Sequence, residues 1–161
     1  MKRILALLCA LLAAIGIHGC DYFAMQDLKV GISTGYEVRD RMGAPTAEWH
    51  NDDGTVTWEF ARMPAGKENY MAVIGPDNIL RDLRQVITED NFGRLRNGMT
   101  QDEVRRLLGR PASKMPLPVK HQEVWEWGYA NPHNADMRFD VFFDQATGTV
   151  VGVDRREEHQ G

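Results

Sequence analysis

The chain has 161 residues, of which 43% are hydrophobic and 26% charged, and this length accommodates one modest domain or two very small ones. Residues 20–161 contain all 23 acidic residues and 17 of the 19 Lys and Arg, so their formal side-chain charge is −6. This acidic balance argues against nucleic acid as a partner. It also argues against attachment to anionic lipid through a polybasic segment.

The N-terminus has the pattern of an export signal. Lys2 and Arg3 precede an uninterrupted run of apolar or small residues at 4–17 (ILALLCALLAAIGI). Such a run is typical of a secretory signal peptide and is shorter than the roughly 20 residues that span a bilayer. It is followed by Gly19-Cys20, which resembles a bacterial lipobox. We expect residues 1–19 to form a lipoprotein signal peptide, the alternatives being an ordinary signal peptide or an uncleaved anchor.

Cys20 is the predicted lipidation site. Cleavage removes Cys9 and leaves Cys20 as the single thiol of the processed chain, a liability in an oxidising compartment unless it is modified. We therefore predict that Cys20 carries diacylglycerol and an N-acyl chain, with no other cofactor, and that residues 20–27 form a tether. A single cysteine provides neither a disulfide framework nor a cysteine-based metal site.

One stretch of the sequence occurs twice. Residues 37–45 (EVRDRMGAP) recur as 103–111 (EVRRLLGRP), and the flanking Leu-x-x-Gly and Trp-Glu motifs keep the same order around both copies. Self-similarity of this kind indicates one structural unit that is used twice. We predict a first repeat at 28–88 and a second at 89–161.

Each copy of the duplicated segment predicts a short helix with a start and a stop. Thr34 with Glu37, and Thr100 with Glu103, match the capping box, in which the Thr hydroxyl and the Glu carboxylate accept hydrogen bonds from free backbone N–H groups. A glycine followed two residues later by a proline then ends each segment, because glycine adopts the left-handed conformation and proline prevents continuation. These identities are explained by local structure.

The remainder of each copy predicts strands. Apolar residues alternate at Val56, Trp58 and Phe60 in the first copy and at Trp125, Trp127 and Tyr129 in the second. Turn residues at 75–78 and 144–148 separate further apolar runs and predict hairpins. The predicted fold class is therefore α+β, a tandem repeat of a small helix plus a three-stranded antiparallel sheet, with another short helix around 90–95.

The alternation also predicts which side chains are buried. We expect Trp58 and Trp125 on the same face of their respective sheets, and Glu59 and Glu126 on the opposite, solvated face. One unit of about 60 residues is marginal on its own, so the two should pack together. Edge-to-edge and face-to-face pairing of the sheets both remain open.

No catalytic set is recognisable in the sequence. His50, His121 and His133 occur singly in predicted loops, without the spacing that would place two metal ligands on one helix face. Nucleophile and base pairs and phosphate-binding loops are not evident either. We predict that the protein is not an enzyme, holds no metal and has no small-molecule substrate.

Two predicted loops are candidates for protein contacts. Met115 and Leu117 lie in a proline-containing stretch at 114–119, where stiffening lowers the entropy lost on binding. Trp49, in the corresponding part of the first copy, is of a type enriched at interfaces. The alternative is that Leu117 folds back onto its own sheet and that Trp49 is partly buried.

The second copy resembles a known family. Residues 95–111 (LRNGMTQDEVRRLLGRP) followed by Val124-Trp125 match the pattern L-x-x-G-M-[TS]-x-x-x-V-x-x-x-[LM]-G-x-P plus an aromatic strand. This pattern is similar to that of the SmpA/OmlA (BamE-like) family of small bacterial lipoproteins. The resemblance implies a periplasm-facing, non-catalytic module whose partners are envelope proteins, including the β-barrel assembly machinery. The first copy matches more loosely.

These features lead to two functional hypotheses. The first is a lipid-anchored protein-interaction module, accessory to outer-membrane β-barrel assembly or envelope integrity. The tandem arrangement also resembles β-lactamase inhibitor protein-like folds, which implies the second, a proteinaceous inhibitor of a secreted enzyme such as a β-lactamase or a lysozyme. For location we favour the outer membrane. The inner membrane is the alternative, because Asp21 after the lipidated cysteine resembles an inner-membrane retention signal.

Overall fold

The computed structural model describes residues 25–133 and 135–158, and the predicted signal peptide, Cys20 and Asp21 lie outside these ranges. The described chain forms two four-stranded antiparallel sheets in the orders β1-β2-β3-β4 and β5-β6-β7-β8. The first repeat comprises α3 (Gly35–Met42), β1 (Ala47–His50), β2 (Val56–Ala61), β3 (Asn69–Ile74) and β4 (Leu80–Gln85). The second comprises α4 (Glu89–Phe92), α5 (Gln101–Leu108), β5 (Ser113–Leu117), η1 (Pro118–Lys120), β6 (Gln122–Ala130), β7 (Asp136–Asp144) and β8 (Val150–Glu157). The predicted tandem α+β fold is confirmed.

The helix boundaries follow the predicted caps. Thr34 and Thr100 each accept a hydrogen bond from the backbone N–H of the Glu three residues on, and that Glu carboxylate accepts from the cap backbone in return. Gly43 and Gly109 end the helices with φ of 83° and 73°, a conformation that favours glycine. Both capping boxes and both stops are therefore present.

The prediction of three strands in each repeat is wrong, because a fourth strand lies at the edge of each sheet. β1 pairs with β2 from Ala47↔Glu59 onward, and β5 pairs with β6 from Ser113↔Glu126 onward. Both strands were predicted as loops because β1 has only four residues and β5 contains Pro116. Proline is compatible with an edge strand, where its missing N–H is not needed for pairing.

Each helix packs on the sheet of its own repeat. The first core joins α3 to the sheet through buried side chains that include Val38, Met42, Trp58, Phe60 and Tyr70. The second joins α4 and α5 to their sheet through side chains that include Phe92, Val104, Leu108, Trp125, Trp127 and Phe139. Both strand tryptophans point to the helix side of their sheets, so they lie on equivalent faces, as predicted. The Phe92 ring stacks on Phe139 at a centroid distance of 4.1 Å.

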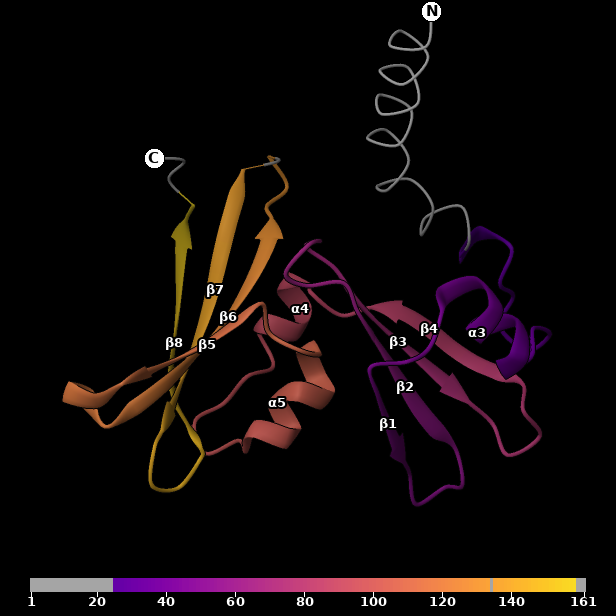
Figure 1. Cartoon of the computed structure of the whole chain (residues 1–161), viewed down its shortest axis with the longest axis horizontal. Coiled ribbons are helices and arrows are strands. Elements are labelled where there is room, and N and C mark those ends of the chain that lie inside the picture. The colour runs from indigo at the N-terminus through magenta and orange to yellow at the C-terminus, as the bar shows by residue number, and fades with distance from the viewer. Residues whose placement is uncertain (1–24, 134, 159–161) are drawn as a thin grey trace, which may run out of the picture.

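The two repeats are stacked with a helix layer between their sheets. Figure 1 shows the sheet β5–β8, then α4 and α5, then the sheet β1–β4, and finally α3 on the far side. Helix α5 therefore covers its own sheet with one face and approaches the first sheet with another. Met63, which follows β2, belongs to the core of the second repeat, and Lys67 forms an ion pair with Asp136 of β7. The sheets pair neither edge to edge nor directly face to face.

Candidate functional site

The junction between the repeats is built around a buried carboxylate. The Glu59 side chain is 0% exposed. One of its oxygens accepts from the backbone N–H of Arg110 at 2.6 Å and the other from Nε of Arg105 at 3.1 Å. The prediction that Glu59 faces solvent is wrong, because α5 covers this face of the first sheet. A buried charge is costly unless it is paired and hydrogen-bonded, and these donors supply both conditions.

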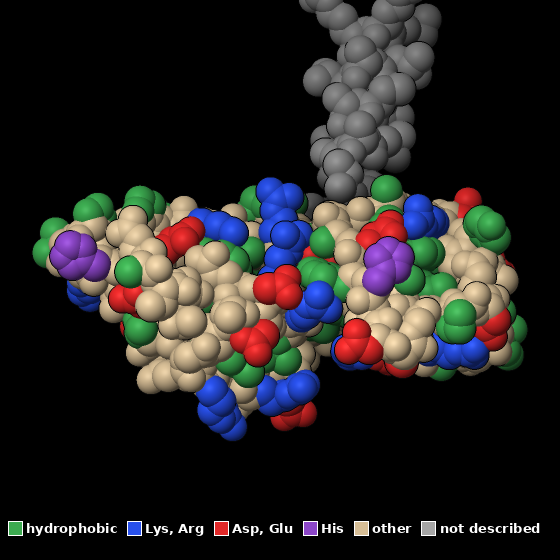
Figure 2. Space-filling model, turned by 90° about the horizontal axis from the view of Figure 1, so that it is seen from below, with side chains coloured by type: hydrophobic (Ala, Val, Ile, Leu, Met, Phe, Trp, Pro, Cys, Tyr) green, Lys and Arg blue, Asp and Glu red, His purple; other side chains and the backbone are tan. Residues whose placement is uncertain are grey.

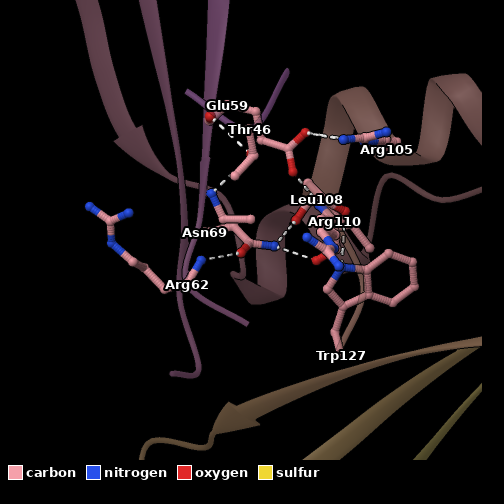
Figure 3. A network of polar contacts seen from close by, with 10 residues as sticks. Thr46, Glu59, Arg62, Asn69, Arg105, Leu108, Arg110 and Trp127 are labelled. Carbon is pink, nitrogen blue, oxygen red and sulfur yellow. Dashed lines mark hydrogen bonds and ion pairs between the residues drawn. The ribbon is translucent and has the colours of Figure 1, made fainter. Parts of the chain in front are cut away.

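Asn69 completes the junction from β3. Its amide nitrogen donates to the carbonyl oxygens of Leu108 and Arg110, both at 2.9 Å, and its amide oxygen accepts from the backbone N–H of Arg62 at 3.1 Å. Figure 3 shows this amide pointing from the first sheet at the C-terminal end of α5. Carbonyls at a helix end lack intrahelical partners, so Asn69 satisfies groups that would otherwise be orphaned. Trp127 donates to the carbonyl of Gly109 at 3.1 Å from the other side.

The equivalent positions of the other copy have different surroundings. Arg39, which corresponds to Arg105, bonds to Glu48 of its own repeat at 2.7 Å. Glu126, which corresponds to Glu59, lies 3.2 Å from Arg138 and also pairs with Arg156. Arg105 and Glu59 therefore pair with each other at the junction, whereas the equivalent Arg39 and Glu126 form ion pairs within their own repeats.

The outer face of the second sheet is charged at one end. Where the first sheet has Asn69 and Met71, the matching register positions of the second are Arg138 and Asp140. Arg156 Nε lies 3.0 Å from Asp140. This hydrogen bond and the charge of Asp140, with a smaller effect of Glu126, raise the pKa of Arg156. Glu126 is thus on the face opposite Trp125, as predicted, but it is paired and its side chain is only 13% exposed. Such a charged surface terminates the stack of layers, as polar caps do in repeat proteins.

The other end of this face is apolar and contains two of the predicted contact residues. Met115 is 47% exposed and lies opposite Val124, which in turn lies opposite Phe142. Leu117 is half-buried at the end of β5. The segment that the sequence predicted as a stiff loop is therefore an edge strand that leads into η1. Its role in binding remains a prediction.

The third predicted contact residue lies elsewhere. Trp49 is half-buried in β1, and its ring centroid lies 5.3 Å from the guanidinium carbon of Arg106 and 5.8 Å from that of Arg105. A hydrogen bond from Arg106 lowers the pKa of Asp102, and Trp49 acts in the same direction. Trp49 therefore packs against α5 and is not brought together with Met115 and Leu117.

A basic cavity lies beside the junction and was missed in the sequence. It has a volume of about 330 Å³ and is lined by Thr46, Arg105, Arg110, Pro111 and Lys114. Figure 2 shows Lys and Arg side chains along the boundary between the two repeats. The sequence contains a feature that could have predicted it: residues 105–114 (RRLLGRPASK) have four basic residues and no acidic one, within a net acidic chain. We call Arg105, Arg110 and Lys114 the basic cluster.

The described residues contain no group of three or more His, Cys, Asp and Glu side chains placed to hold a metal ion. His50 lies in β1 and His121 lies at the end of η1, so these two histidines belong to different repeats. Within residues 25–133 and 135–158, no helix is long and apolar enough to cross a membrane. Two surfaces of the described residues are candidate contact sites, the basic cavity and the open face of the second sheet.

The fold and these surfaces define a tandem α+β protein with two helix-on-sheet modules. Residues 85–148, which span most of the second module, match the sequence model of the outer membrane protein assembly factor BamE domain. The resemblance of residues 95–111 to the BamE-like family is confirmed. No curated protein matches this chain.

Two solved structures match this chain at low sequence identity. A candidate β-lactamase inhibitor protein from Streptococcus mutans is 11% identical, with 86% of this chain and 97% of that chain covered and a TM-score of 0.35. A DUF4309 family protein from Bacillus subtilis subsp. subtilis strain 168 is 15% identical, with 83% and 84% covered and a TM-score of 0.31.

Proposed function

We propose that this protein is a lipid-anchored, periplasm-facing interaction module that is accessory to outer-membrane β-barrel protein assembly. The observation that carries the proposal is the match of residues 85–148 to the BamE domain. The apolar run followed by Gly19-Cys20 supports the anchor, with acyl chains on Cys20 as the covalent lipid. More than one acyl chain is needed for stable attachment of a protein to the membrane. The outer membrane is the favoured location, and Asp21 makes the inner membrane the alternative.

The geometry supports a role in binding. The junction around Glu59 and Asn69 fixes the two modules relative to each other, so a partner would meet a preformed surface and little ordering entropy would be lost. Met115 and Leu117 offer apolar contact area at the rim of an open sheet face. Exposed apolar groups with polar surroundings are the usual composition of a protein-binding patch.

Site-specific photocrosslinking in cells tests this proposal. A photoreactive residue is placed at Met115 of the full chain, with one at Tyr36, which is 79% exposed on the first repeat, as the matched control. We expect Met115, and not Tyr36, to crosslink to a component of the outer-membrane assembly machinery, and a deletion strain to show lower porin levels. Unchanged porin levels together with no envelope protein in the crosslinks would refute the assembly role. A crosslink dominated by a secreted hydrolase would favour an inhibitor instead.

A further inference from the structure

The basic cavity is assembled from both repeats. Thr46 precedes β1, Arg105 belongs to α5, Arg110 and Pro111 follow that helix, and Lys114 belongs to β5. Because α5 is held between the sheets, these side chains are positioned by the junction. Cavities at domain boundaries are common places for ligands.

Two of the three cations in the cavity have no acidic partner. Among the described residues, no carboxylate lies within ion-pair distance of Arg110 or Lys114, whereas Arg105 is paired with Glu59. The hydroxyl of Thr46 is already used, since it donates to the carbonyl of Glu59 at 3.1 Å and accepts from the N–H of Ala61 at 3.3 Å. The cavity therefore presents excess positive charge and free donors.

Lys114 is held in place without an ion pair. Its ammonium nitrogen lies 3.6 Å from the centroid of the Trp125 ring, a cation–π contact. Partial burial lowers the pKa of this ammonium group, and the charges of Arg105 and Arg110 act in the same direction against that of Glu123. Glu123 is itself bonded to Gln101 at 3.0 Å. An incoming anion would relieve the repulsion among the three cations.

We infer that the basic cluster binds carboxylate side chains of an acidic segment in a protein partner. Guanidinium groups match carboxylates in a bidentate geometry, and an ammonium group adds a point charge. Residues 20–161 have a formal side-chain charge of −6, which repels extended polyanions such as an anionic membrane surface or a nucleic acid. A short acidic segment entering the cavity is affected mainly by the local cations, because screening limits the field to about 8 Å at physiological salt. This inference rests on the proposed function, since it specifies the kind of partner.

The test compares two double variants of the full chain, purified in a neutral detergent. Arg110→Gln with Lys114→Gln removes two charges from the basic cluster, and Lys29→Gln with Lys120→Gln removes the same charge from exposed positions elsewhere. Arg105 is left intact because it pairs with Glu59. Binding of fluorescein-labelled hexaglutamate is measured by anisotropy, with hexaglutamine as the neutral peptide. Inorganic phosphate and vesicles containing an anionic phospholipid are run as competitors.

We expect the cluster variant to bind hexaglutamate about tenfold more weakly than wild type, from two lost ion pairs, and the control to bind as wild type. Equal losses in both variants, binding of hexaglutamine, or preferential displacement by anionic vesicles would each overturn the inference. The Met115 crosslink is then repeated in the cluster variant. A crosslink retained at wild-type level with hexaglutamate affinity unchanged would refute the inference alone. No envelope protein in the wild-type Met115 crosslinks, together with unchanged porin levels, would refute the proposed function alone.

Discussion

Asn69 of the first repeat closes the C-terminal end of a helix that belongs to the second, by donating to the carbonyl oxygen of Leu108 at 2.9 Å. The donor and the acceptor are 39 residues apart in the chain. Together with the buried Glu59, this contact makes the junction a polar seam within a largely apolar interior. Separation of the repeats would break these hydrogen bonds and would expose apolar side chains such as Met63, which belongs to the core of the second repeat. The repeats should therefore unfold together.

Replacing Asn69 tests this coupling. Asn69→Ala removes the donor to the buried carbonyl of Leu108 and to the partly buried carbonyl of Arg110, and a buried group left unsatisfied costs about 1–3 kcal/mol. We expect the free energy of unfolding to fall by about 2–4 kcal/mol, measured by urea denaturation, with a single transition in wild type. Asn97→Ala, at an exposed position, should change it by less than about 0.5 kcal/mol. A loss for Asn69→Ala as small as for Asn97→Ala would contradict the coupling.

Gly43 and Gly109, which end helices α3 and α5, allow a comparison of two equivalent substitutions. Both have positive φ, but a Cβ at Gly43 would meet nothing within 4 Å, whereas one at Gly109 would lie 2.8 Å from the amide nitrogen of Asn69. Alanine at either position incurs backbone strain, and overpacking adds about 1–3 kcal/mol at Gly109 alone. We expect Gly109→Ala to lower the midpoint of urea unfolding more than Gly43→Ala does. Equal losses would show that Asn69 moves aside freely.

The sequence predicts those features of the fold that depend on neighbours along the chain. The caps at Thr34 and Thr100 and the alternation around Trp58 and Trp125 are local, and all are present in the structure. Nothing local distinguishes Glu59 from Glu126, since both follow a tryptophan in equivalent strands. One is buried and the other lies on an outer face because α5 covers the Glu59 face of the first sheet but packs on the opposite, Trp125 face of its own sheet.

The candidate site was harder to predict for the same reason. The basic cluster combines Arg105, Arg110 and Lys114 with Thr46 from the other repeat, and only the stacking of the layers brings them together. The charge of residues 105–114 was visible in the sequence, whereas the lack of an acidic partner for Arg110 and Lys114 among the described residues was not. Edge strand β5 was missed because Pro116 interrupts the apolar pattern.

Lipidation is a prediction that concerns residues outside the described ranges. Cys20 follows the apolar run directly after Gly19, and a thioether-linked diacylglycerol requires the cysteine sulfur. Cys20→Ser should abolish metabolic labelling by a fatty-acid probe and release the protein from the membrane fraction. Cys9→Ser is the control, since that residue lies within the predicted signal peptide, and it should leave labelling intact. Persistent labelling of Cys20→Ser would exclude this anchor.

The capping carboxylates predict how stability depends on pH. Hydrogen bonds from the backbone and then the side chain of Thr34 lower the pKa of Glu37 below its ordinary value of 4.5, and Thr100 does the same for Glu103. A carboxyl group whose pKa is lower in the folded state stabilises the fold above its unfolded pKa. This stabilisation is lost as the pH falls from 4.5 through the folded-state values. We therefore expect the midpoint of urea unfolding to fall as acid is added below about pH 5.

A double variant isolates this contribution. Glu37→Gln with Glu103→Gln keeps side chains that can accept from the cap backbone but removes the two titrating groups. Its midpoint of urea unfolding should decline less steeply between pH 5 and pH 3 than that of wild type. The difference in slope should correspond to the protons that these two groups take up on unfolding. At pH 7 the variant should be the less stable protein, because charged acceptors bind the cap more strongly than neutral ones and an acidic group favours the helix N-terminus. An unchanged slope would assign the acid sensitivity to other carboxylates, with Asp144, whose pKa Thr147 lowers, as the next to test.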